Sequence, residues 1–201
     1  MSRKRRTIGM FSTALAILVL TAGMLFGCQK SNEISLKDLK TEGEYQYAKA
    51  MWNTSVQEGE KSLPFSMEKH PIVPEGNTGK YYVPYRSENI TVDGLKATAK
   101  WEFYEDQLKY IQFVFEIPED GCQEQFDKEV ERLTRQFGSE SEKKEYPETG
   151  TQAYLWETDH TRLMITLSTG GTQNPYGSPT MFLSISHLSL LEDKYRDMPH
   201  Q

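Results

Sequence analysis

Two segments in the second half of the chain alternate apolar and polar residues, and this pattern restricts the fold more than any other feature of the sequence. Apolar residues occupy every second position from Leu95 to Phe103 and again from Ile111 to Ile117. An alternation with a period of two is typical of a β-strand that buries one face. Polar residues 105–107 lie between the two segments, so the sequence predicts an antiparallel hairpin.

An amphipathic helix is expected directly after this hairpin. Asp120 can cap its start, with Gln123 at the reciprocal capping-box position, and Gly138 can close its end in a left-handed conformation. Four apolar residues fall at the i, i+4, i+7 and i+11 positions of one helical face, namely Phe126, Val130, Leu133 and Phe137.

A charged loop is expected over 139–150. Three further strands are predicted at Ala153–Thr158, Arg162–Thr169 and Met181–His187, the first two joined by a turn at Asp159 and His160. A long loop, 170–180, precedes the last strand. The predicted order is strand, strand, helix, strand, strand, strand. This order favours an α+β fold, in which an antiparallel sheet has one face covered by an amphipathic helix.

The region before residue 91 is less regular. A flexible tether is expected over 28–43, because that segment is polar and charged, and an N-terminal helix over 44–58, because its apolar residues are spaced by three and four. Prolines make 61–86 an extended, irregular segment that wraps over the surface, in which Tyr81, Tyr82 and Val83 could form a short edge strand. The predicted domains are therefore 28–43 as tether, 44–90 as helix and wrapping segment, 91–190 as α+β core and 191–201 as tail.

The first residues have the layout of a secretory signal peptide. Basic residues at positions 3–6 run into a stretch without charge, Thr7 to Gly27, which ends at Cys28. The sequence Leu25-Phe26-Gly27-Cys28 resembles the lipobox of bacterial lipoproteins, in which a small residue precedes an invariant cysteine. Phe26 departs from the smaller residue usual at its position.

This resemblance implies that residues 1–27 are a signal peptide that is removed, and that Cys28 is the lipidation site. In the lipoprotein family this cysteine carries a diacylglycerol group and often a third acyl chain such as palmitate, which gives durable attachment. The protein would then be anchored in the cell membrane and face outside the cytoplasm. The alternative is an uncleaved signal anchor, because residues 7–27 are long enough to cross a hydrocarbon core of about 30 Å.

The C-terminal half carries a second, looser resemblance. A Phe-Tyr-Glu-Asp-Gln-Leu turn, a helix ending at Phe137-Gly138, Trp156 and a final strand are similar to features of small domains in uncharacterised lipoproteins of Gram-positive bacteria. The resemblance covers roughly residues 90–188, and it implies no established activity.

The net charge excludes some classes of binding partner, and the cysteine content excludes an internal disulfide. All 29 acidic residues follow Cys28 but only 19 of the 23 basic ones do, which leaves a net charge of −10 beyond that residue. Such a domain should be repelled by nucleic acid and by anionic lipid headgroups, which argues against a polyanion-binding role and against peripheral docking through basic patches. Cys122 is then the remaining cysteine, so a disulfide within the mature chain is excluded. At the start of the predicted helix its thiol could be reactive, but a structural thiol is favoured.

No catalytic, cofactor-binding or metal-binding residue is predicted. The four histidines, at positions 70, 160, 187 and 200, do not form a metal-binding spacing. Asp159 and His160 are expected simply to make a turn. The paired glycines 170 and 171 are not followed by the Lys-Ser or Lys-Thr of a phosphate-binding loop.

The sequence therefore favours a non-enzymatic binding or interaction module, which would contact a protein, peptide or glycan through an exposed sheet face or the 170–180 loop. The alternative is an extracytoplasmic enzyme, a hydrolase or a thiol-dependent enzyme, whose residues meet only in the folded chain. A concave site with two facing carboxylates, or with a carboxylate close to His160 or His187, would favour that alternative, and a flat polar surface would count against it.

Overall fold

The structure is a computed structural model that describes residues 32–69, 82–170 and 178–189. Within these ranges the fold is mostly β-sheet, with one large mixed sheet and two α-helices. The expected α+β fold, with one helix covering an antiparallel sheet and another helix near the N-terminus, is therefore wrong. The predicted signal peptide (1–27), Cys28 and the tail (191–201) lie outside the described residues.

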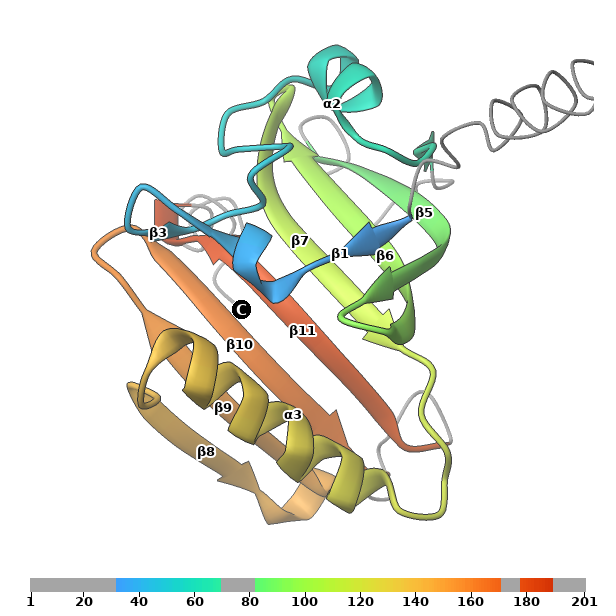
Figure 1. The fold of residues 1–201 in the computed structure, drawn as a ribbon, viewed down its shortest axis with the longest axis vertical. Helices are drawn as coiled ribbons and strands as arrows, with labels where there is room; N and C mark the ends of the chain where they lie inside the picture. Colours follow the sequence, from blue (N-terminus) through green and yellow to red (C-terminus); the bar gives the residue numbers. More distant parts are fainter. Residues whose placement is uncertain (1–31, 70–81, 171–177, 190–201) are drawn as a thin grey trace, which may run out of the picture. The chain divides into compact units, whose positions relative to one another are not determined.

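The described strands of the large sheet follow the order β1-β5-β6-β7-β11-β10-β9-β8, with β4 paired to β5 beside this path. β1 runs parallel to β5, and the other pairings are antiparallel. β1 and β8 thus form opposite edges of the sheet (Figure 1). The bounds are β1 (Glu33–Ile34), β4 (Glu68–Lys69), β5 (Tyr82–Val92), β6 (Leu95–Tyr104), β7 (Gln107–Phe115), β8 (Glu142–Tyr146), β9 (Thr151–Glu157), β10 (Thr161–Ser168) and β11 (Thr180–His187).

The hairpins expected from alternation are confirmed. β6 and β7 pair antiparallel, and Glu105 and Asp106 form the turn between them with φ of 48° and 61°. Positive φ at both turn residues matches the right-handed twist of the strands. β9 and β10 form the second predicted hairpin, and β11 pairs with the other side of β10.

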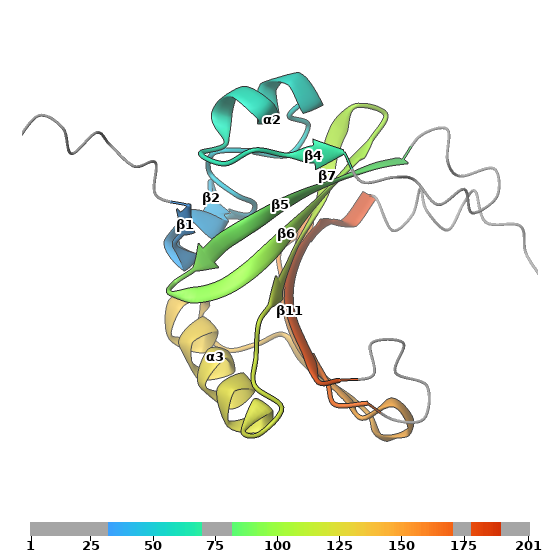
Figure 2. The same ribbon diagram turned by 90° about the vertical axis from the view of Figure 1, so that its right-hand side faces the viewer.

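α3 (Cys122–Phe137) packs against only part of one face of the sheet, and the N-terminal segment packs against another part, so the face is not covered by a helix alone (Figure 2). That segment contains the 3-10 helix η1 (Leu36–Leu39) and the hairpin of β2 (Lys40–Thr41) and β3 (Glu44–Tyr45). α3 ends at Gly138, as predicted, but Gly138 has φ of 90° and ψ of −174° instead of the expected left-handed helical conformation. Its N-cap, however, is Gly121 in a left-handed conformation (φ 84°) with no side-chain cap, so the predicted capping by Asp120 is wrong.

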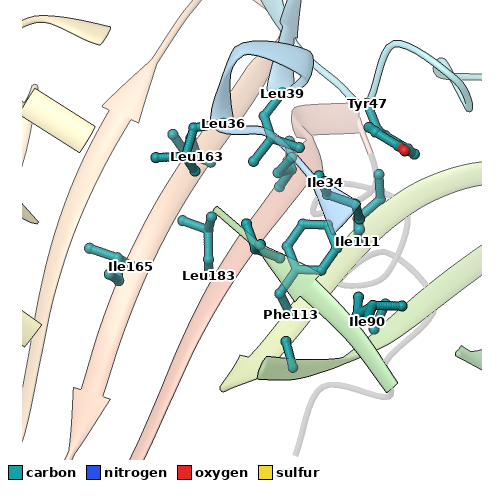
Figure 3. Packing of buried hydrophobic residues seen from close by; sticks show 14 of the residues in the cluster. Ile34, Leu36, Leu39, Tyr47, Ile90, Ile111, Phe113, Leu163, Ile165 and Leu183 are labelled. Carbon is teal, nitrogen blue, oxygen red and sulfur yellow. The ribbon is translucent and has the colours of Figure 1, made fainter. Parts of the chain in front are cut away.

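The core lies between the sheet and these covering elements (Figure 3). Trp101 of β6 is fully buried, and its ring packs against Tyr47 and Phe65 of the N-terminal segment at centroid distances of 6.0 and 5.6 Å. Elsewhere on the same face of the sheet, α3 buries Phe126 and Leu133. The alternating strands therefore bury their apolar face beneath two separate pieces of chain.

The predicted helix over 44–58 is absent because tertiary contacts outweigh the apolar spacing. The Tyr45 backbone N–H donates to the Thr161 hydroxyl (2.8 Å), which fixes this stretch as β3. Helix α2 (Val56–Ser62) begins only after Ser55, whose side chain forms a capping box with Glu58. A capping box fixes where a helix starts, so the helix begins there.

The structure also differs from the expected tether and loops. Ile34, Leu36 and Leu39, which lie in the expected tether, are buried in the core, and the compact unit begins at Asn32. β5 occupies part of the region expected to be irregular, although it contains Pro84. The expected charged loop over 139–150 contains β8, which pairs with β9 through its backbone.

Candidate functional site

A surface cavity of about 210 Å³ lies where β8 passes into β9. We call it the β8–β9 cavity. It lies at the edge of the sheet opposite β1, and the Thr169 side of its lining adjoins the start of the 170–180 loop. Its lining residues are Glu145, Tyr146, Pro147, Gly150, Thr151, Gln152 and Thr169.

A short turn shapes this cavity. The 3-10 helix η3 (Pro147–Thr149) follows β8, and Gly150 ends it in a left-handed conformation with φ of 59°. A left-handed residue is strained for most side chains, which explains the glycine. The carbonyl of Gly150 accepts hydrogen bonds from the backbone N–H and the hydroxyl of Thr169, both at 3.0 Å. The turn is thereby fastened to the end of β10.

Tyr146 is the aromatic side chain of this cavity, and it is 43% exposed. Among the described residues, Tyr146 and Met51 are the large apolar side chains that are exposed. Exposed tyrosine offers a flat apolar ring together with a polar tip, a combination that is common at binding surfaces. The Tyr146 ring is therefore available to a ligand.

The other side chains supply hydrogen-bonding groups that are already positioned. The Thr149 hydroxyl donates to Thr151 (2.9 Å), and the amides of Gln152 and Gln123 bond to each other (3.0 and 3.4 Å). Hydroxyl and carbonyl oxygens keep further lone pairs for a ligand. Glu145 adds a carboxylate, which pairs with Lys143 at 2.8 Å. The cavity therefore presents an aromatic ring beside hydroxyl, amide and carboxylate groups.

A second cavity, of about 200 Å³, lies between η1, the β5–β6 turn and the end of α3. Its central side chain is Arg132, which forms ion pairs with Asp93 and Glu129, each at 3.0 Å. Arg132 also donates to the backbone carbonyl of Asp93 (3.2 Å). Because these contacts engage the guanidinium, we interpret this cavity as a joint between α3 and the sheet.

The arrangement that would favour an enzyme is partly present. The Glu44 carboxylate accepts hydrogen bonds from the hydroxyls of Thr158 and Thr161, the latter at 2.7 Å. Burial acts to raise the pKa of Glu44, but these hydrogen bonds and the charges of His160 and His187 outweigh it, so the pKa is lowered. A carboxylate held ionised by two hydroxyls is better suited to fastening β3 than to accepting a proton.

His187 lies on the same side of the molecule as this carboxylate. Burial, Lys109 and His160 lower the pKa of His187, and Glu44 partly opposes them. Its Nδ1 accepts from the backbone N–H of Ser189 (3.3 Å), and its ring contacts Trp52 edge to face. These contacts describe a packed imidazole rather than one presented to a substrate.

The other residues discussed from sequence are dispersed. Cys122 is a free thiol that packs against the core at the start of α3. His70, His200 and Gly171 lie outside the described residues. Within the described ranges no group of three or more His, Cys, Asp or Glu residues could hold a metal ion. In the same ranges no helix is long and apolar enough to cross a membrane.

Sequence reasoning missed the β8–β9 cavity because its residues come from a stretch interpreted as a solvated loop. The local signal was Tyr146-Pro147, an aromatic residue followed by proline within a charged stretch. In comparisons with known proteins, no family model, no curated protein and no solved structure matches this chain.

Proposed function

We propose that this protein is a non-enzymatic binding module, anchored by lipid on Cys28 to the outer face of a bacterial cell membrane, and that it binds a glycan in the β8–β9 cavity. The anchor rests on the signal peptide and lipobox of the sequence. The observation that carries the binding function is the exposed ring of Tyr146 beside positioned hydroxyl and amide groups.

Chemistry favours a glycan over other partners at this cavity. Sugar rings present flat C–H faces together with many hydroxyls, and the cavity offers a tyrosine ring beside Thr151, Gln152 and Thr169. Binding sites commonly combine an apolar surface with a few placed polar groups. The Glu145 carboxylate can accept two hydrogen bonds from adjacent hydroxyls. An uncharged peptide is the competing partner.

Binding can be tested with the detergent-solubilised, full-length lipidated protein on arrays of envelope glycans and uncharged peptides. We expect glycan binding that weakens at least tenfold in Tyr146→Ala and is largely kept in Tyr146→Phe. Met51→Ala is the matched control, because it removes the other exposed apolar side chain. Full binding by Tyr146→Ala would exclude this cavity, and binding of peptides alone would exclude the glycan.

The anchor needs its own experiment. Cys28→Ala should abolish incorporation of labelled fatty acid and release the protein from the membrane fraction. Membrane retention that is unchanged in this variant would instead support the uncleaved signal anchor.

An enzyme is the second candidate function, favoured by the position of Glu44 near His160 and His187. If this cluster were catalytic, the protein would hydrolyse model ester, amide or glycoside substrates, and Glu44→Gln would abolish the activity. Activity that survives in Glu44→Gln, or that depends on Cys122, would exclude this cluster.

A further inference from the structure

We propose that the edge of the sheet formed by β1 and β5 lies against the phospholipid headgroups, and that the opposite end, around β8 and the start of α3, points away from the membrane. This inference rests on the proposed lipidation of Cys28. It goes beyond the binding function, because it assigns a membrane-facing surface and an orientation.

The chain is fixed to the sheet from Asn32 onward. The backbone carbonyl of Asn32 accepts from the Thr91 N–H (3.0 Å), and its side-chain amide donates to the carbonyl of Asn89 (3.3 Å). Two residues later, Ile34 is fully buried, and its carbonyl accepts from the Asp93 N–H (2.9 Å). Asn32 is therefore fixed at the β1–β5 edge of the sheet.

The chain between the lipidated residue and this edge is short. Four peptide units join Cys28 to Asn32, and an extended chain spans at most about 3.6 Å per residue, so they reach about 14 Å. The sequence-based tether over 28–43 would have reached about 50 Å. The folding of Asn32, Ile34 and Leu36 into the domain removes most of that length.

The opposite edge is much farther away. Seven inter-strand steps separate β1 from β8 in the sheet order (Figure 1). At about 4.8 Å a step, they amount to about 34 Å measured along the sheet. The tether length alone therefore permits an upright domain, with β1 close to the headgroups and β8 remote from them.

Charge selects this upright orientation over one in which the sheet lies flat. Segments 32–41 and 86–96 at the β1–β5 edge each hold two basic and two acidic residues and are neutral. Residues 119–128, which lead into α3 and form its first turns, hold four acidic residues and one basic one, and 140–148 has a net charge of −2. Gln123 and Gln152 join these two acidic segments by a side-chain hydrogen bond. An anionic bilayer repels that acidic end.

Site-specific quenching tests the orientation. The full-length lipidated protein with Cys122→Ala is labelled at an introduced cysteine, either Lys96→Cys near the β5–β6 turn or Glu148→Cys beside β8. Both replaced residues are exposed. The labelled proteins are inserted into phosphatidylethanolamine and phosphatidylglycerol vesicles that carry a headgroup-linked quencher. We expect the label at position 96 to be quenched at least threefold more than the label at position 148.

Flotation of the vesicles distinguishes failure of the proposed orientation from failure of the proposed lipid anchor. Equal or inverted quenching in protein that floats with the vesicles overturns the orientation and leaves the anchor standing. Protein that does not float overturns both. As a matched control, twelve Gly and Ser residues inserted before Asn32 should preserve flotation and reduce quenching at position 96 to less than half. Unchanged quenching in this variant would overturn tether length as the cause.

Discussion

The two edges of the sheet are built in different ways. At the β1–β5 edge the chain is held by buried Ile34, by backbone bonds to Asn32 and by the Arg132 ion pairs. At the other edge β8 has no fully buried side chain, and Glu142 to Glu145 form ion pairs within the strand. One edge thus contributes to the core, whereas the other is joined mainly by backbone and is free to present a binding surface.

The largest expected effect is at the β1 edge. Ile34→Ala should lower the free energy of unfolding by about 2–5 kcal/mol, because it leaves a cavity under a fully buried side chain. Chemical denaturation of the lipid-free domain measures this. Lys144→Ala in β8 is the control and should change stability by less than about 0.5 kcal/mol. Equal losses at both positions would contradict the difference between the edges.

The ion pairs should show the same difference with a smaller effect. Arg132→Met should lower stability by about 2 kcal/mol, because it leaves the largely buried carboxylate of Glu129 without its cation. Lys144→Met breaks an exposed pair with Glu142 and should cost less than about 0.5 kcal/mol. Denaturation at low and high salt measures both. A loss at Arg132 that disappears in high salt would show that its pairs are only surface contacts.

Acid should weaken the contact between Glu44 of β3 and the turn that joins β9 to β10. The lowered pKa of Glu44 means that its contribution is complete above pH 4.5, its usual value, and is lost as the pH falls through the folded-state pKa. Glu44→Gln should cost about 1–2 kcal/mol at neutral pH and nothing in strong acid. Denaturation of both proteins as a function of pH measures this. Parallel curves at all pH values would contradict the assignment.

The smallest effect concerns a hydroxyl in β10, between the edges. Thr166 is 4% exposed, and its hydroxyl has no hydrogen-bond partner among the described residues. Thr166→Val keeps the side-chain shape and should raise stability by about 1 kcal/mol. Thr161→Val, which removes a hydroxyl that is bonded to Glu44, should lower it. Calorimetry of the two variants compares them, and a loss in Thr166→Val would reveal a hidden partner.

The regular second half of the chain could be predicted, and the first half could not. Alternation identified β6, β7, β9, β10 and β11 because each buries one face in the core. β8 was not predicted because Glu142 to Glu145 bury no side chain fully. Only a short edge strand around Tyr82 and Val83 was predicted where β5 lies, because proline usually disfavours a strand. The spacing of apolar residues predicted a helix around Tyr45. That spacing carries no information about the hydrogen bond to Thr161, more than a hundred positions away.

The candidate site was less predictable than the fold. The binding role of the 170–180 loop stays a prediction, and Thr169, which precedes the loop, lines the β8–β9 cavity. Gln152 and Thr151 carry no signal of their own, because their role depends on the turn at Gly150 and on Gln123 of α3. Such a site depends on contacts between elements, which periodicity does not encode.

The charged side chains of β8 affect how one molecule can associate with another. An edge strand offers unpaired backbone groups to which a neighbouring chain can add its own strand, and that is how many β-proteins polymerise. Lys143, Lys144 and Glu145 place charged side chains along this edge, so a second strand would bring charges together on both faces. Charges on an edge strand disfavour the addition of a strand from another molecule, so this edge is less prone to edge-to-edge association than an apolar one.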